Sequence, residues 1–240
     1  MSADPAEQRV CVVVPTLNEA ENVAALVEHI MRVAPGCGEI IVVDDGSVDG
    51  TRDLVRGLAA AYPVRLVERN APTLGLSGAV MAGARLADGE VLVVMDADLS
   101  HPPEAIPNLL QPLLDGRADM VIGSRYVRGG TTPGWPLYRK AMSRLAAAMA
   151  YPLTGVHDSM CGFFAIRRSL LLELAPAATG FKIAFETIAR GGKRLRVLEV
   201  PIAFRDRARG QSKMSFGVAL LFAFRWLAAV WRRSLRRSSR

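Results

Sequence analysis

Five apolar runs rich in β-branched residues recur along the first half of the chain, with helix-like stretches between them. The runs span residues 10–15, 39–45, 64–68, 90–96 and 118–124, and the helix-like stretches span roughly 20–34, 51–62, 76–87 and 103–115. This alternation predicts an α/β fold with βαβ units and a mostly parallel sheet, and such continuous apolar strands are typical of a sheet covered on both faces. Ligands of these sheets bind beyond the carboxyl ends of the strands, so the residues after each run are the candidate site.

Charge is distributed unevenly along the 240 residues, whose formal net charge is +7. Residues 205–240 contain ten Lys or Arg and one acidic residue, a net charge of +9, and the other 204 residues have a net charge of −2. The near-neutral body argues against nucleic acid binding, and the basic end predicts an anionic partner. Because half of the residues are hydrophobic, the chain can bury a sizeable core.

The cysteines and the N-terminal residues predict a location in the cytosol. Cys11, Cys37 and Cys161 show no Cys-x-x-Cys spacing, which fits a reducing compartment and implies no disulfide framework. The polar stretch 1–9 does not have the pattern of a secretory signal, so we expect it to be an extension of the domain.

Two loops lack the common phosphate-binding motifs. "PTLNEAEN" (15–22) is not G-x-G-x-x-G, which disfavours a nicotinamide-binding protein, and Asn18 there could cap the following helix. "TLGLSGAVMAG" (73–83) has no G-K-[ST] sequence, so its glycines are expected to allow a tight turn and close helix packing.

Acidic residues follow two of the strand-like runs. In "DDGSVDGT" (44–51), helix capping explains Asp49 and Thr51 but not Asp44 at the end of an apolar strand. In "VLVVMDADLSHPPE" (91–104), Asp96 and Asp98 stand two residues apart; one of them could cap the helix that begins near residue 103. Two close carboxylates repel each other, and a divalent cation such as Mg²⁺ removes that cost. The sequence therefore predicts a metal site here.

Eight motifs occur in an order that resembles family 2 glycosyltransferases, specifically the dolichol-phosphate (polyprenol-phosphate) mannosyltransferases. They are "VVVPTLNEAENV", "IIVVDDGSVDGT", "VLVVMDADLSHPPE", "VIGSRYVRGG", "WPLYRKAMSRLA", "DSMCGFFAIRR", "GFKIAFE" and "VPIAFRDRARGQSKM". The resemblance implies a GT-A fold over residues 10–215, with a Rossmann-like sheet flanked by helices. It also implies a nucleotide-sugar donor (GDP-mannose), Mg²⁺ or Mn²⁺, and a polyprenyl or dolichyl phosphate acceptor.

The resemblance also implies roles for particular residues. The nucleotide sugar would be bound by Pro15, Leu17, Glu19, Val42, Asp44, Asp96, Ala97, Asp98, Arg125, Arg207 and Lys213. The metal would lie at Asp96, Asp98 and Ser100, and the acceptor phosphate at Arg125, Arg139 and Ser143. The expected catalytic residues are Asp98, Arg125, Arg139 and Ser143, and Asp158 would stand near the acceptor sugar.

Three positions depart from the family pattern. Leu17 replaces a common tyrosine, Ser100 replaces a glutamine that often assists the metal, and "NAPTLGL" lacks a basic residue often found before its glycine. These departures affect the expected contacts with the donor base and one expected metal ligand.

The residue types fit transfer to a phosphate independently of the resemblance. Arg139 and Ser143 are four apart on a predicted helix and so share a face, and arginine can donate two parallel hydrogen bonds to a phosphate. The alternative for Arg139 is a solvated charge on the helix surface, and the alternative for Arg125 is an ordinary surface ion pair. A lipid phosphate is already anionic at neutral pH, so its attack needs no general base, and His101 is expected to be structural. Direct attack would invert the anomeric centre.

The C-terminal segment is expected to bind a membrane surface. Residues 216–231 are apolar with Arg225 in the middle, which favours an amphipathic helix in the interface over a spanning helix. The tail 232–240 adds five arginines, which attract anionic headgroups. We therefore expect a peripheral enzyme on the cytoplasmic face; a terminal helix packed on the body is the alternative.

Three functional hypotheses follow. The first is transfer of mannose to a polyprenyl phosphate. The second keeps the fold and acceptor but uses UDP-glucose or UDP-N-acetylglucosamine, and the third is a silent nucleotide-sugar-binding membrane scaffold. The presence of both aspartates and all the phosphate-binding basic residues favours an enzyme, and a membrane protein partner is left open.

Overall fold

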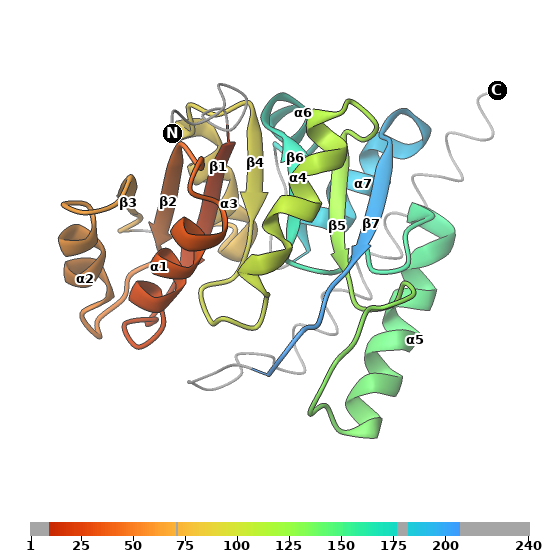
Figure 1. Ribbon diagram of the computed structural model, residues 1–240. Coiled ribbons are helices and arrows are strands. Elements are labelled where there is room, and N and C mark those ends of the chain that lie inside the picture. Colours follow the sequence, from red (N-terminus) through yellow and green to blue (C-terminus); the bar gives the residue numbers. More distant parts are fainter. Residues whose placement is uncertain (1–9, 71, 177–181, 207–240) are drawn as a thin grey trace.

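The computed structural model describes residues 10–70, 72–176 and 182–206, which form one mixed seven-stranded sheet with helices on both faces (Figure 1). The strands are β1 (Val10–Thr16), β2 (Glu39–Asp44), β3 (Val64–Glu68), β4 (Val91–Val94), β5 (Met120–Ser124), β6 (Phe164–Arg167) and β7 (Val197–Pro201). Their spatial order is β3-β2-β1-β4-β6-β5-β7. All five predicted strands are confirmed.

The described helices are α1 (Val23–Val33), α2 (Thr51–Leu58), α3 (Gly75–Leu86), α4 (Ile106–Leu114), α5 (Leu137–Thr154), α6 (Arg168–Leu174) and α7 (Ile183–Gly191), with short 3₁₀ turns at Pro103–Ala105 and Gly192–Arg194. The first four match the four expected stretches with small shifts at their ends, and α5 is the helix expected to contain Arg139 and Ser143. In Figure 1, α1 and α4 lie in front of the sheet, whereas α3, α6 and α7 lie behind it. The α5 helix projects past the carboxyl ends of β5 and β7 (Figure 1).

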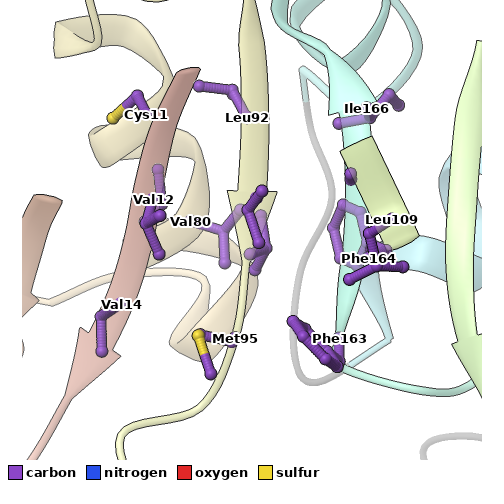
Figure 2. Close-up of a cluster of buried hydrophobic side chains, with 14 of the residues drawn as sticks. Cys11, Val12, Val14, Val80, Leu92, Met95, Leu109, Phe163, Phe164 and Ile166 are labelled. Atoms are coloured by element: carbon purple, nitrogen blue, oxygen red, sulfur yellow. The ribbon is translucent and has the colours of Figure 1, made fainter. Parts of the chain in front are cut away.

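Burial on both faces of the sheet explains the apolar strands. Every residue of β1, β4 and β5 is buried, and Figure 2 shows side chains from β1, β4 and β6 packed with α3 and α4. Gly83 of α3 allows a close approach to the sheet, because a Cβ there would lie 2.6 Å from Val13 Cγ1 and 3.1 Å from Val43 Cγ2. The predicted packing role of the glycine-containing stretch is thus confirmed at this position.

The strand order reverses at the centre of the sheet. From β1 the chain moves outward to β2 and β3, and then returns to place β4 on the other side of β1. Such a reversal between parallel strands opens a ligand-binding crevice at their carboxyl ends. The loops after β1, β2 and β4, which contain the predicted donor residues, therefore meet at one edge.

One strand has an orientation that the sequence did not predict. β6 is antiparallel to both β4 and β5, so the residues that precede it arrive at the carboxyl ends of these two strands. The segment around Asp158 is thereby brought to the same edge as the aspartates after β4.

Several predictions concern residues outside the part of the chain that is described. These are the N-terminal extension 1–9, Arg207 and Lys213, the apolar helix 216–231 and the basic tail 232–240. Among the residues that are described, no helix has both the length and the apolar character that crossing a bilayer requires.

Candidate active site

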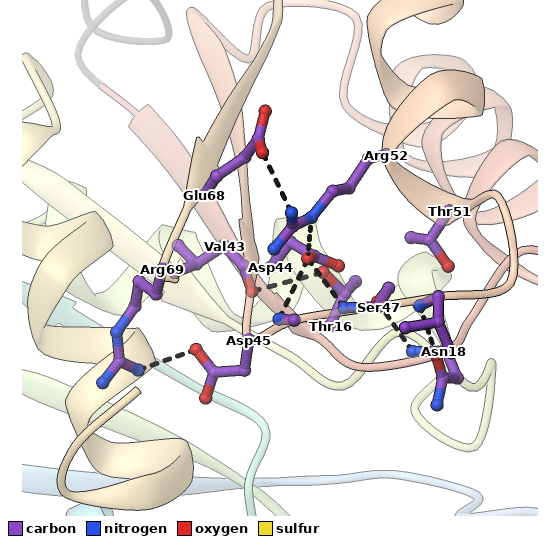
Figure 3. A network of polar contacts seen from close by, with 12 residues as sticks. Thr16, Asn18, Val43, Asp44, Asp45, Ser47, Thr51, Arg52, Glu68 and Arg69 are labelled. Atoms are coloured by element: carbon purple, nitrogen blue, oxygen red, sulfur yellow. Dashed lines mark hydrogen bonds and ion pairs between the residues drawn. The ribbon is translucent and has the colours of Figure 1, made fainter. Parts of the chain in front are cut away.

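The loops after β1 and β2 are joined by polar contacts (Figure 3). The backbone N–H of Asn18 donates to Ser47 Oγ at 2.8 Å, and Asn18 Oδ1 accepts from the N–H of Val48 at 2.9 Å. Asn18 has a φ of 56°, in the left-handed region that asparagine tolerates. Its side chain therefore ties two site loops together, and the alternative that it caps α1 is wrong.

Asp44 is fully buried at the end of β2. Its Oδ1 accepts from the N–H groups of Gly46 and Ser47 at 3.1 and 3.0 Å and from Arg52 Nε, while its buried Oδ2 has no hydrogen-bond partner within the described residues. Burial alone would raise the pKa of Asp44, but hydrogen bonds from Ser47, Arg52 and Gly46 outweigh it and lower the pKa. The carboxylate is thus charged, with one buried oxygen left without a hydrogen bond from the described residues.

The other predicted nucleotide-binding residues surround this point. Pro15 is buried in β1, and Leu17 and Glu19 are half-buried in the loop that follows. Val42 is fully buried inside β2, two residues before the strand ends, so its side chain offers no exposed surface to a ligand. The assignment of these four residues to the nucleotide stays a prediction.

The paired aspartates lie in a turn just beyond β4, because the strand ends at Val94. Asp96 is partly open, with 36% of its side chain exposed, whereas Asp98 and Ala97 are buried. Asp98 Oδ1 accepts the N–H of Ser100 at 3.1 Å, and Leu99 adopts a φ of 59° to close the turn. The chain therefore turns at Asp98, and the alternative that one of the aspartates caps the helical turn at Pro103–Ala105 is wrong, because its N-cap residue is Pro102.

His101 stabilises this turn through a hydrogen bond to the backbone of Asp96. Its Nδ1 accepts the N–H of Asp96 at 3.2 Å, and its ring stacks on Phe163 and meets the edge of Phe204, each at 5.2 Å between centroids. Burial lowers the pKa of His101, mainly through loss of solvation, and the accepted hydrogen bond requires a neutral Nδ1. The structural role expected for His101 is therefore confirmed.

The donor set at this turn fits a hard divalent cation. Mg²⁺ takes one or two carboxylates and fills its other positions with water and phosphate oxygens. Asp96 and Asp98 would supply the carboxylates, and the buried Ser100 Oγ has no hydrogen-bond partner among the described residues. That part of the chain contains no group of three or more acidic, histidine or cysteine side chains arranged for a metal.

Arg125, at the end of β5, forms a buried ion pair with Asp158. Asp158 Oδ2 accepts from the N–H and Nε of Arg125 at 2.9 and 2.7 Å, and Oδ1 accepts from Nη2 at 2.7 Å. Burial by itself would lower the pKa of Arg125, but the hydrogen bonds that it donates to the charged Asp158 outweigh this effect and raise the pKa above its ordinary value. The arginine predicted to face a phosphate thus uses two of its nitrogens on a carboxylate, and Nη1 takes no part in this pair.

The predicted acceptor residues on α5 lie next to this pair. Ser143 accepts a hydrogen bond from the Tyr126 hydroxyl at 2.5 Å, and Arg139 stacks on the Trp135 ring at 4.0 Å from its centroid. The Arg125 guanidinium lies over both aromatic rings, at 5.2 and 5.5 Å. The structure therefore brings Arg125, Arg139 and Ser143 into one cluster.

Aromatic contacts join this cluster to the aspartate turn. Trp135 meets the edge of Phe204 at 5.4 Å, and Phe204 in turn contacts His101 beneath Asp96. Gly162, before β6, lies beside Asp96, since a Cβ there would be in van der Waals contact with both carboxylate oxygens, at 3.5 Å. The aspartate turn and the arginine cluster are thus contiguous in the structure.

Sequence reasoning missed several residues of this site. Tyr126, Trp135 and Phe204 surround the arginines, Asp206 pairs with Arg139, and Lys182 donates to the carbonyl of Met160 at 3.4 Å. The adjacency of an aromatic residue to the arginine expected to bind phosphate, as in "SRY", was the available signal. No pattern indicated Asp206 or Lys182.

Comparison with solved structures supports the fold. The crystal structure of glucosyl-3-phosphoglycerate synthase from Mycobacterium tuberculosis, in complex with Mn²⁺, UDP and glucosyl-3-phosphoglycerate, matches with a TM-score of 0.68 at 24% identity. The match covers 93% of this chain and 79% of that one. This is a GT-A-like α/β fold, as the motifs predicted.

Curated relatives are more similar in sequence. The chain is 44% identical over 213 residues to a dolichol-phosphate mannosyltransferase of Pyrococcus furiosus, covering 86% of this chain and 59% of the relative. It is 38% identical to the dolichol-phosphate mannosyltransferase of Saccharomyces cerevisiae, covering 88% and 83% of the two chains. It is 41% identical to a polyprenol monophosphomannose synthase of Mycolicibacterium smegmatis, covering 87% and 82%. The family model described as glycosyl transferase family 2 matches residues 11–175, and the chain belongs to that family.

Proposed function

We infer that this protein is a glycosyltransferase that moves mannose from GDP-mannose to a polyprenyl or dolichyl phosphate. The observation that carries the inference is that a carboxylate turn and a cluster of phosphate-binding residue types lie side by side at one edge of the sheet. Asp96 and Asp98 form the carboxylate turn for the donor, and Arg125, Arg139 and Ser143 form the cluster for an anionic acceptor. The relatives described above are named as dolichol-phosphate mannosyltransferases and a polyprenol monophosphomannose synthase, which supports the sugar and the acceptor.

The chemistry requires positioning and charge neutralisation more than proton transfer. The phosphate oxygen of the acceptor is anionic and attacks without a general base, which agrees with the neutral, buried state of His101. Attack on the side opposite the nucleoside diphosphate inverts the anomeric centre and gives a β-mannosyl phosphate. Arg139 and Ser143 orient the nucleophile, and this proximity supplies a large share of the rate enhancement.

A divalent cation, Mg²⁺ or Mn²⁺, would be held by Asp96 and Asp98, with Ser100 adjacent. When bound, it would offset the negative charge that develops on the departing nucleoside diphosphate. The chain itself would hold this turn through His101, whose ring fixes the backbone of Asp96.

The surface of α5 supports a membrane-bound acceptor. The helix that contains Arg139 and Ser143 also exposes large apolar side chains, at Leu137, Tyr138, Met142, Leu145 and Met149. An apolar stripe on a helix that also binds a phosphate suits a lipid whose headgroup lies at the bilayer surface. We propose that this face of α5 contacts the membrane.

A transfer assay tests the proposal. The purified protein, Mg²⁺ and a short polyprenyl phosphate are mixed separately with GDP-mannose, UDP-glucose or UDP-N-acetylglucosamine, and lipid-linked sugar is measured by mass spectrometry. We expect product from GDP-mannose, loss of product in Asp98→Ala, and normal product in Asp88→Ala, which changes an exposed carboxylate before β4, at the opposite edge of the sheet.

The other outcomes distinguish the competing hypotheses. Product from a UDP-sugar alone would keep the acceptor and overturn the mannose assignment. Nucleotide binding without product from any donor would favour the silent scaffold over an enzyme.

A further inference from the structure

The acceptor arginine already has an anionic partner from this chain. Arg139 Nη1 lies 2.5 Å from Oδ1 of Asp206, while the guanidinium face stacks on Trp135 at 4.0 Å. Both charged side chains are partly exposed, 39% for Arg139 and 51% for Asp206, so a ligand at the surface can reach them. The carboxylate thus occupies one of the positions where an acceptor phosphate would bind Arg139.

Asp206 is held in this place by the backbone before it. The segment that follows β7 pairs with the loop after β5, through the N–H of Thr131 to Ile202 O at 2.9 Å and the N–H of Phe204 to Thr131 O at 3.0 Å. On its other side, the N–H of Arg205 donates to Ser100 O at 3.1 Å, next to the paired aspartates. A segment tied on both sides fixes the direction in which the chain reaches Asp206.

The charges of the competing ligands differ in a way that matters here. A phosphomonoester carries a charge of about −1.5 to −2 at neutral pH, because its second pKa is near 6. A carboxylate carries −1, and a phosphodiester headgroup also carries −1. Exchanging Asp206 for a diester therefore brings Arg139 no additional negative charge, whereas exchanging it for a monoester does.

We propose that Asp206 is a specificity-determining residue that makes Arg139 select phosphomonoester lipids over the phosphodiester lipids of the bilayer. The inference rests on the proposed function, since it takes a polyprenyl phosphate as the acceptor. Diester headgroups surround any enzyme that works on a membrane, and an arginine without a partner there attracts them. The Asp206 carboxylate has the same charge as these headgroups, so only the dianionic acceptor displaces it from Arg139.

The experiment measures the KM for a polyprenyl phosphate in vesicles of phosphatidylcholine, with and without added phosphatidylglycerol. For wild type we expect little change in KM when phosphatidylglycerol is added. For Asp206→Asn we expect a lower KM in phosphatidylcholine alone, by up to about fivefold, the factor that a partly exposed ion pair can supply. We also expect phosphatidylglycerol to raise the KM of this variant several-fold.

Two further variants complete the test. Asp206→Glu keeps the charge and should retain wild-type selectivity, and Asp115→Asn removes an exposed carboxylate that pairs with Arg117 and should behave as wild type. Equal inhibition of wild type and Asp206→Asn by phosphatidylglycerol would overturn the proposal, as would a fall in kcat of Asp206→Asn without a change in KM. Absence of any lipid-linked mannose from wild type would instead refute the proposed function.

Discussion

Replacing Asp158 with asparagine tests the energetic weight of the buried ion pair beside the site. Asp158 is fully buried and accepts three hydrogen bonds from Arg125, whose side chain is only 11% exposed. Asparagine has nearly the same shape but is neutral, and its side-chain NH₂ group would face an N–H donor of Arg125. The guanidinium would remain buried without a compensating charge.

The expected loss follows from this stranded charge. Removing one partner of a buried ion pair costs about 3–5 kcal/mol of unfolding free energy. For a domain of this size, each kcal/mol lowers the melting temperature by about 2–4 °C, so we expect a decrease on the order of 10 °C. The measurement is thermal and urea unfolding followed by circular dichroism, with Asp115→Asn as a surface control that should melt like wild type.

The double variant separates lost charge pairing from lost packing. Arg125→Met combined with Asp158→Asn removes the stranded charge, so it should be more stable than Asp158→Asn alone. The reasoning would be refuted by an Asp158→Asn protein within about 1 kcal/mol of wild type. It would also fail if the double variant lost the sum of the two single effects.

Three further predictions concern packing, thiols and acid stability. Gly83→Ala should destabilise the fold by about 1–3 kcal/mol, because the new methyl group would meet Val13, whereas Gly57→Ala, with open space around it, should be neutral or slightly stabilising in urea unfolding. All three cysteines are buried and burial raises their thiol pKa values, so a thiol reagent at pH 8 should label the protein only after denaturation. A hydrogen bond from Arg196 lowers the pKa of Asp119 in the folded state, so the stability it adds is present above the ordinary value near 3.9 and is lost as the pH falls through the folded value. The difference in urea midpoint between wild type and Asp119→Asn should therefore shrink on acidification below about pH 4, and a constant difference would contradict this account.

The residue pattern alone was sufficient to predict the local elements and the gathering of the acidic residues at the strand ends. Continuous β-branched runs predicted all five leading strands, although the run 90–96 forms a strand only over Val91–Val94. The carboxyl ends of parallel strands share one edge, so the positions of Asp44, Asp96 and Asp98 in the chain also predicted that they would gather there. Spacing by four residues likewise placed Arg139 and Ser143 on one face of α5.

The rest of the site depends on contacts between distant segments. Asp158 reaches Arg125 across 33 positions in sequence because β6 inserts antiparallel between β4 and β5. Arg139 and Asp206 are 67 positions apart and meet because β7 pairs with β5 and directs the chain toward α5.

Sequence by itself therefore determined which segments become strands and helices, and which chemistry lies at the strand ends. Hydrophobic periodicity reports these properties, because the spacing of apolar residues within one element shows whether one or both of its faces are buried. Only the tertiary structure decided which charges are neutralised. The order and direction of strands in the sheet set the partners of Arg125 and Arg139, and hydrophobic periodicity is the same for a strand in either direction.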